Sequence, residues 1–140
     1  VFADTAARWC RANLADTPLQ AELPAWDSGR ASEPDELVVV RQIWEEIRRF
    51  MWNYVGIVRT HRRMKRARRR IVLVKEEIEA YYWDFKLTPD LIELRNLADV
   101  ADCVVQCALR RRESRGLHYH ADFPEADPAQ VRDTVIQRWM

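Results

Sequence analysis

Apolar residues recur along most of this chain at alternating spacings of three and four, which is the period of one face of an α-helix. A first helix is predicted over residues 2 to 14, where Phe2, Ala6, Trp9 and Cys10 share one face. Three longer apolar stripes follow, with short connections between them. Three such stripes in succession predict three helices that each bury one face against their neighbours.

The three stripes make the predicted fold class all-α. We expect an antiparallel three-helix bundle over residues 35 to 116, in the up-down-up order of a spectrin repeat. One helix and an extended linker precede this bundle, and an irregular C-terminal tail follows it. The predicted core residues are Leu37, Val40, Trp44, Ile47, Met51 and Tyr54 in its first helix, Met64, Ala67, Ile71, Val74, Ile78, Tyr81 and Phe85 in its second, and Leu91, Leu94, Leu97, Ala101, Val104 and Ala108 in its third.

Capping residues mark the predicted ends of these helices. Ser32 or Glu33 is expected to cap the first bundle helix. Thr88 is expected to cap the third, because Pro89 follows it and proline is tolerated at the first helical position. Gly116 is expected to end the third helix, because glycine adopts the left-handed conformation that commonly terminates helices.

Two segments lack a helical pattern. Residues 15 to 34 predict an extended linker, in which we expect Trp26 to pack against an apolar surface. The tail from residue 117 to 140 is predicted to be irregular, and for residues 129 to 139 helix and strand both remain open. The turn-forming residues of the linker are Pro18, Pro24, Gly29 and Pro34.

The stretch RTHRRMKRARRR, residues 59 to 70, has eight Lys or Arg in twelve positions. A nucleic-acid-binding element would need these charges on one face, with aromatic residues between them. Here the charges surround the predicted helix except at its apolar stripe, and residues 75 to 102 carry eight acids against three bases. We therefore favour a solvated or domain-facing surface over nucleic-acid binding.

Histidine and cysteine suggest two kinds of chemistry, and neither forms a complete site. Cys103 and Cys107 are one helical turn apart, but a closed zinc site needs four ligands, so buried free thiols are the favoured interpretation. His118 and His120 are the best catalytic candidates by residue type, because histidine titrates near neutral pH. We favour a structural role for them, since no catalytic triad can be assembled around them.

The composition excludes several classes of protein. The chain has three glycines, too few for a glycine-rich phosphate-binding loop, and no apolar stretch approaches the roughly 20 residues that span a bilayer. Its net charge of +1 makes any basic surface a local one. Three widely spread cysteines predict reduced thiols and a cytoplasmic location. The chain begins at Val1 inside a helical pattern, so we expect a fragment of a longer protein.

Several stretches resemble one enzyme family closely. They are FMWNYVGIVRT at 50 to 60, VKEEIEAYYWDF at 74 to 85, LTPDLIELRNL at 87 to 97 and RRESRGLHYHADFPE at 111 to 125. Together they resemble the C-terminal helical domain of the L-aspartate oxidases, which belong to the succinate dehydrogenase and fumarate reductase flavoprotein group. The wider group shares an ESRG-x-H pattern, and the matching residues here are Glu113, Ser114, Arg115, Gly116 and His118.

The resemblance implies what the whole protein does. An L-aspartate oxidase converts L-aspartate to iminoaspartate by hydride transfer to FAD, and oxygen or fumarate reoxidises the flavin. The product feeds quinolinate and NAD biosynthesis. The resemblance also places the catalytic and FAD-binding residues upstream of this chain, so none is expected here. Residues 1 to 14 would be the last helix of the FAD-binding domain, 15 to 34 a linker, 35 to 116 the bundle, and 117 to 140 a tail packed on the bundle or the flavin domain.

The partners implied by the resemblance are the FAD-binding and capping domains of the same polypeptide, with L-aspartate as the substrate of the full enzyme. The candidate residues for docking onto those domains are Arg59, Glu113, Ser114, Arg115 and His118. No membrane partner is expected. The alternative reading is a free-standing helical adaptor, or a nucleic-acid-binding module that uses residues 59 to 70.

Overall fold

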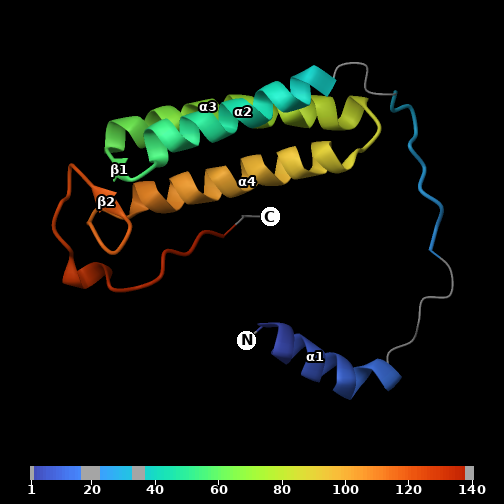
Figure 1. Ribbon diagram of the computed structural model, residues 1–140, viewed down its shortest axis with the longest axis horizontal. Helices are drawn as coiled ribbons and strands as arrows, with labels where there is room; N and C mark the ends of the chain where they lie inside the picture. The colour runs from blue at the N-terminus through green and yellow to red at the C-terminus, as the bar shows by residue number, and fades with distance from the viewer. Residues whose placement is uncertain (1, 17–22, 33–36, 138–140) are drawn as a thin grey trace.

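The computed structural model describes residues 2–16, 23–32 and 37–137. The described chain is mostly helical, as the hydrophobic pattern predicted. Its helices are α1 (Phe2–Asn13), α2 (Leu37–Val55), α3 (His61–Asp84) and α4 (Pro89–Arg110), with short 3-10 helices at Leu14–Asp16 and Pro128–Gln130. Helices α2, α3 and α4 lie side by side, and each packs against the other two (Figure 1).

The description as all-α was incomplete. Two strands of two residues each, β1 (Val58–Arg59) and β2 (Tyr119–His120), pair in parallel at one end of α2–α4 (Figure 1). Val58 is in register with Tyr119, and Arg59 with His120. Segments this short carry no detectable alternation of apolar and polar residues, so the sequence pattern could not show them.

The core-facing stripe of α3 is confirmed. Its buried residues are Met64, Ala67, Ile71, Val74 and Ile78. Tyr81 packs against the edge of the core and stacks on Phe85, with ring centroids 4.2 Å apart. The start of α3 is capped by Thr60, whose side-chain oxygen accepts a hydrogen bond from the Arg63 N–H at 3.2 Å.

The stripes of α2 and α4 were predicted only in part. In α2, Ile43 and Phe50 are buried beside Val40 and Ile47, whereas Trp44, Met51 and Tyr54 pack at the edge of the core. In α4 the buried residues are Leu91, Leu94, Ala98, Ala101, Val105 and Ala108. The expected Leu97 lies at the core edge, and the expected Val104 is 39% exposed. Continuing the helical period from Leu94 selects residues 98 and 105, so the choice of residues 97 and 104 was wrong by one position each.

The start of α4 was predicted correctly from its capping residue, whereas its end was not. Thr88 caps α4 with Pro89 in the first turn, as predicted, and its side-chain oxygen accepts from the Leu91 N–H at 3.2 Å. The prediction that Gly116 ends α4 was wrong, because the helix stops at Arg110. Gly116 has a φ of +56° and lies instead in the turn between Arg115 and His118.

The linker touches the helices at one described point. The Ser32 N–H donates to the Asp84 carbonyl at 3.1 Å, and the Lys86 N–H donates to the Ser32 carbonyl at 2.9 Å. Ser32 is thus bound to the α3–α4 connection, while the expected cap at Glu33 lies outside the described residues. Trp26 was expected to pack on an apolar surface, but it is 75% exposed. Helix α1 has no buried residue.

Candidate functional site

The five residues predicted to dock onto other domains come together at the end of α2–α4 that carries β1 and β2. Arg59 lies in β1, and Glu113, Ser114, Arg115 and His118 lie between the end of α4 and β2. Parallel pairing of the two strands brings residue 59 next to residues 118 to 120, far apart in sequence. The site is therefore built where the chain leaves α2 and where it leaves α4.

Arg59 joins the end of α2 to the turn that precedes β2. Its Nε donates to the Val55 carbonyl at 3.0 Å and to the Gly56 carbonyl at 3.2 Å, which satisfies carbonyls at the helix end. Its Nη1 lies 2.7 Å from Nδ1 of His118, and Nε2 of His118 lies 3.1 Å from the Arg111 carbonyl. A guanidinium only donates and a carbonyl only accepts, so His118 is the neutral tautomer with its proton on Nε2.

The electrostatic surroundings of His118 favour this neutral form. Burial lowers the pKa of its imidazole, and the positive charges of Arg59 and Arg111 act in the same direction. The neutral imidazole accepts a hydrogen bond from Arg59 at Nδ1 and donates one to the Arg111 carbonyl from Nε2. The bonds of both ring nitrogens agree with a structural role for His118, and that role stays a prediction.

Glu113 is the centre of a buried ionic network. It is fully buried, and its carboxylate accepts from Arg115 through Nε at 3.0 Å and Nη2 at 2.9 Å, and from Arg111 through Nη1 at 2.5 Å. The Asp127 N–H also donates to it, at 2.8 Å. Hydrogen bonding from Arg115, then from Asp127 and Arg111, lowers the pKa of Glu113 to about 2 despite its burial.

Arg111 extends this network into the C-terminal tail. Its guanidinium donates to the carbonyls of Gln130 and Arg132 and to the hydroxyl of Thr134. Arg115 adds a bond to the Asp127 carbonyl at 3.1 Å. Two arginines held by one carboxylate thus fasten residues 127 to 134, which have little regular structure of their own.

Ser114 binds the loop that follows β2. Its Oγ donates to the Phe123 carbonyl at 2.8 Å and accepts from the His120 N–H at 2.9 Å. Its own N–H donates to the Glu125 carbonyl at 3.0 Å. One serine therefore fixes both sides of this loop, which explains why a small hydroxyl residue lies between Glu113 and Arg115.

The same loop reaches back to the start of α3. The Ala121 N–H donates to the Arg59 carbonyl at 2.8 Å, and the carboxylate of Asp122 accepts from the His61 N–H at 2.8 Å. An acidic side chain at a helix N-terminus is favourable, because it neutralises the unpaired N–H groups and the positive end of the helix dipole.

His120 is buried, with an exposed fraction of 1%. Its Nδ1 accepts from the Asp122 N–H at 3.2 Å and its ring lies 4.9 Å from that of Phe123, while Nε2 has no hydrogen-bond partner within the described residues. Burial lowers the pKa of its imidazole. These contacts place His120 in the packing under the loop.

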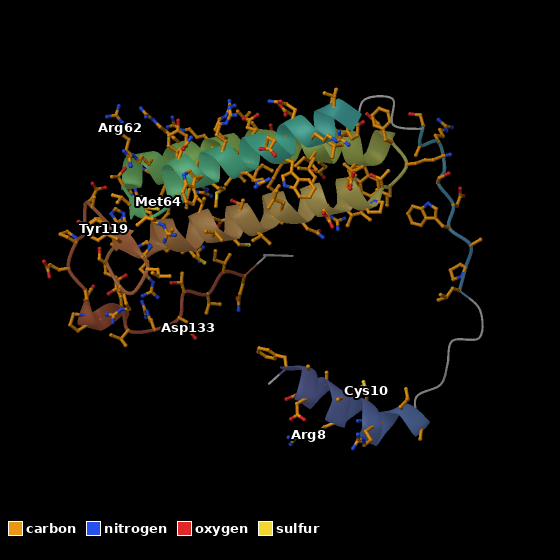
Figure 2. All side chains as sticks on the ribbon, viewed as in Figure 1. Arg8, Cys10, Arg62, Met64, Tyr119 and Asp133 are labelled. Carbon is orange, nitrogen blue, oxygen red and sulfur yellow. The ribbon has the colours of Figure 1, made fainter. Side chains whose placement is uncertain are left out.

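Within residues 2–16, 23–32 and 37–137, no group of three or more His, Cys, Asp or Glu side chains could hold a metal ion. The Arg and Lys side chains from residue 62 to 70 are exposed, and Figure 2 shows Arg62 on the outer side of α3. A groove of about 730 Å³ between α2 and α3 is lined by Arg66, Arg69 and Arg70, but also by Glu45 and Glu46. Cys103 and Cys107 are free, as expected, but Cys103 is exposed and Cys107 half-buried, so the expectation that they are buried was wrong.

Sequence reasoning missed three members of the network, Arg111, Asp127 and Thr134. Because the third helix was predicted to end at Gly116, Arg111 fell in its last turns, where an arginine needs no further partner. The usable signal was Asp127-Pro128, because Asp followed by Pro often begins a short helix. The Asp127 carboxylate does accept from the Ala129 N–H at 2.9 Å at the start of the 3-10 helix.

Comparison with known proteins agrees with this architecture. Residues 44–139 match the family described as fumarate reductase flavoprotein C-term. The chain is 47% identical over 136 residues to an L-aspartate oxidase of Pseudomonas aeruginosa, covering 97% of this chain and 25% of that one. It is 50% identical over 123 residues to L-aspartate oxidase 1 of Ralstonia nicotianae, covering 88% of this chain and 23% of that protein.

A solved structure gives the same picture. A chain in the Mycobacterium smegmatis Sdh1 complex in the apo form superposes with a TM-score of 0.53 at 25% identity, over 88% of this chain and 20% of that one. This chain spans about a quarter of the length of the two L-aspartate oxidases described above. Within the described residues, none of the helices is both long and apolar enough to cross a membrane.

Proposed function

Because the chain belongs to the fumarate reductase flavoprotein C-terminal family, we propose that it is the C-terminal helical domain of an FAD-dependent L-aspartate oxidase. The observation that carries this proposal is the 47% identity to the Pseudomonas aeruginosa L-aspartate oxidase across 97% of the chain. The parent enzyme would oxidise L-aspartate to iminoaspartate, with oxygen or fumarate as electron acceptor. Its product would enter NAD biosynthesis through quinolinate, in the bacterial cytoplasm.

FAD is assigned to the upstream domains in this proposal. A dinucleotide cradle needs several glycines close together, so that the backbone can approach the phosphates. In the described residues the glycines with positive φ, Gly29 and Gly116, stand far apart in the sequence and on different segments. The residues of this chain do not fit the cofactor, and we assign them neither a catalytic role nor a cofactor-binding one.

The proposed role of the chain is to support the flavin-bearing part of the enzyme. Helices α2, α3 and α4 would act as an antiparallel, up-down-up bundle whose buried core keeps its end rigid. In the same scheme residues 1 to 14 are the last helix of the FAD-binding domain. The exposure of Phe2 (91%) and Trp9 (63%) supports this assignment, because an amphipathic helix needs an apolar partner for that face.

The proposed docking surface lies at the end with the two strands. Four apolar residues there are exposed: Ile57 at 76%, Val58 at 48%, Leu117 at 95% and Tyr119 at 45%. Val58 and Tyr119 are paired in register across the strands, and Leu117 is in the turn before β2. An exposed apolar group of this kind marks an interaction surface.

The five predicted docking residues take different parts in this proposal. Glu113 and Ser114 face inward, so they would act by fixing the loop and tail rather than by touching another domain. Arg59 and His118 hold the turn that presents Leu117, and Arg115 closes that turn through backbone bonds with His118. Leu117, which the sequence reading did not single out, becomes the residue expected to make the contact.

The reaction is tested on the purified full-length protein. We expect bound flavin that is bleached by L-aspartate under anaerobic conditions, and peroxide formation when oxygen is admitted. D-Aspartate and L-glutamate serve as controls for the substrate class. A full-length protein that binds flavin but leaves it oxidised in the presence of L-aspartate would contradict the proposed substrate while leaving the family membership intact.

The docking role is tested by substituting Leu117. The Leu117→Asp variant of the full-length protein should release flavin more readily and unfold at a lower temperature, because a charge replaces an apolar contact. Val100→Asp is the matched control, since Val100 is 61% exposed on α4, away from the strands. Equal flavin retention in both variants would contradict the docking surface. Arg115→Ala should produce the same loss more weakly, because it removes the side-chain bonds to Glu113 and to the Asp127 carbonyl that hold the tail.

A further inference from the structure

The groove between α2 and α3 carries more positive than negative charge. Four arginines line it against two glutamates, a net charge of +2. Both glutamates have partners in the structure. Glu46 pairs with Arg70, which also lines the groove, and Glu45 lies 3.4 Å from Arg48, which does not. The remaining charges of the lining are therefore all positive.

These remaining charges are Arg49 of α2 and Arg66 and Arg69 of α3. Within the described residues, their side chains form no ion pair and no hydrogen bond. Arg66 and Arg69 are three positions apart on one helix, so their side chains are neighbours on its surface. Like charges close together repel each other unless an anion lies between them. The groove therefore favours a negatively charged ligand.

Neutral hydrogen-bond donors line the same groove. The Asn53 amide and the Tyr54 hydroxyl are among its lining groups, and neither side chain forms a hydrogen bond within residues 2–16, 23–32 and 37–137. Amide and hydroxyl groups donate to phosphate oxygens, as arginine does. Phe50 is 5% exposed and gives the groove an apolar base. A few polar groups around an apolar base are typical of a small-molecule site.

The unpaired groups gather toward one end of the groove. The chain passes from α2 to α3 through β1, so the end of α2 and the start of α3 lie together (Figure 1). The unpaired donors come from the second half of α2 and the first half of α3, whereas Glu45 and Glu46 precede them in α2. The positive part of the groove is therefore nearer to β1 than its acids are.

The number of unpaired arginines indicates the kind of anion. One phosphate group carries at most about two negative charges near neutral pH, so two linked phosphates are needed to balance three guanidinium groups. A guanidinium also binds phosphate through two parallel N–H···O bonds. The groove volume of about 730 Å³ is in the range of small-molecule sites and leaves room for an organic group beside the phosphates.

We propose that the groove between α2 and α3 binds a small molecule with two linked phosphate groups, held by Arg49, Arg66 and Arg69. Asn53 and Tyr54 donate to the remaining phosphate oxygens. A single-stranded nucleic acid fits less well, because it needs exposed aromatic rings on which its bases stack. The aromatic rings of this groove are those of the buried Phe50 and the half-buried Tyr54.

The test is isothermal titration calorimetry of inorganic pyrophosphate into the full-length protein that contains this chain. The protein keeps its bound flavin, and free flavin is removed beforehand. Pyrophosphate should bind at least about tenfold more tightly than inorganic phosphate, because it offers more charge-assisted hydrogen bonds. Raising the salt from about 50 mM to about 500 mM should weaken it. No binding of pyrophosphate, or equal affinity for the two anions, would overturn the proposal.

Substitutions on α3 then locate the site. Arg66→Gln with Arg69→Gln should weaken pyrophosphate binding at least about tenfold, because two charge-assisted contacts are lost. The control is Lys65→Gln with Arg68→Gln, which removes the same charge from exposed positions of α3 that do not line the groove. Its affinity should stay close to that of the unaltered protein. Equal losses in the two variants would show a general effect of charge and overturn the assignment to the groove.

A substitution on α2 tests the site independently. Arg49→Gln should also weaken pyrophosphate binding, whereas Arg41→Gln, at an exposed position outside the groove, should not. Unchanged affinity in Arg49→Gln would contradict a site shared by both helices. Because the substituted arginines have no partner in the described fold, Tm and circular dichroism should match the unaltered protein.

A competing ligand is tested on the same variants. A single-stranded RNA of about 12 nucleotides is titrated in place of pyrophosphate. Tighter binding of this RNA, lost in Arg66→Gln with Arg69→Gln but kept in the control, would overturn the assignment to a small molecule. Activity toward L-aspartate is measured separately, so failure of the proposed reaction leaves this result unaffected.

Discussion

Glu113 and Arg115 form a two-pronged ion pair, with Nε donating to Oε1 at 3.0 Å and Nη2 to Oε2 at 2.9 Å. The planar guanidinium matches the carboxylate, which makes this geometry stronger and more directional than a single contact. Arg111 binds the same carboxylate from the end of α4. One buried acid therefore joins the last helix, the turn before β2 and the tail.

Replacing Glu113 with Gln should destabilise the chain and free the tail. Two guanidinium groups would lose their shared counter-charge in a buried site, which is more harmful than losing a surface pair. We expect a lower Tm and faster proteolysis within residues 127 to 134. The control is Glu125→Gln, because Glu125 is exposed and contributes only its backbone carbonyl. Matching Tm and cleavage rates in the two variants would contradict this role.

The contribution of Glu113 should disappear in acid. Its pKa is lowered from 4.5 to about 2, so the folded state favours the carboxylate. The stabilisation is then complete above pH 4.5 and is lost as the pH falls toward 2. Urea unfolding at several pH values should show the gap between the wild type and Glu113→Gln closing over this window. A gap that stays constant down to pH 2 would contradict a charge-based role.

The sequence predicted the features that depend on local pattern. The cap at Thr88 and the α3 stripe are set by neighbours in sequence, and both are as expected. The α4 stripe was misassigned at two positions, where Leu97 was chosen in place of Ala98 and Val104 in place of Val105, although the helical period from Leu94 places residues 98 and 105 inward. Side-chain size favoured Leu97 over Ala98, whereas Val104 and Val105 are the same residue and only the spacing distinguishes them.

This misassignment gives a direct test at adjacent positions of α4. Val105 is fully buried, so Val105→Ala should cost on the order of 2 kcal/mol through lost contacts and a cavity. Val104 is 39% exposed, so Val104→Ala should change stability by no more than about 0.5 kcal/mol. Both variants remove the same atoms from the same helix. Urea unfolding should separate them, and equal losses would place the two residues at the same depth.

For the candidate site, the sequence predicted which residues belong to it but not which contacts they make. The motif selected Glu113, Ser114, Arg115 and His118, and all four do lie together. The groups that bind this motif and Arg111 include Asp127 and Thr134, which lie in the irregular C-terminal tail. Such contacts leave no periodic signal in a sequence, so neither the hub role of Glu113 nor the inward direction of its carboxylate was predicted.

His120 should make the free energy of unfolding decrease as the pH becomes mildly acidic. Burial lowers the pKa of His120, so its neutral form is favoured in the folded state, and stability falls as the pH drops below 6.5 toward that lowered value. Asp122, His61 and Arg59 are the charged or titratable groups that act on it. His120→Asn keeps an acceptor near Nδ1 but does not titrate. Its free energy of unfolding should therefore change less steeply between pH 7.5 and 5. A remaining slope is expected, because burial also lowers the pKa of His118. Parallel pH profiles for the wild type and His120→Asn would show that His120 does not titrate on unfolding.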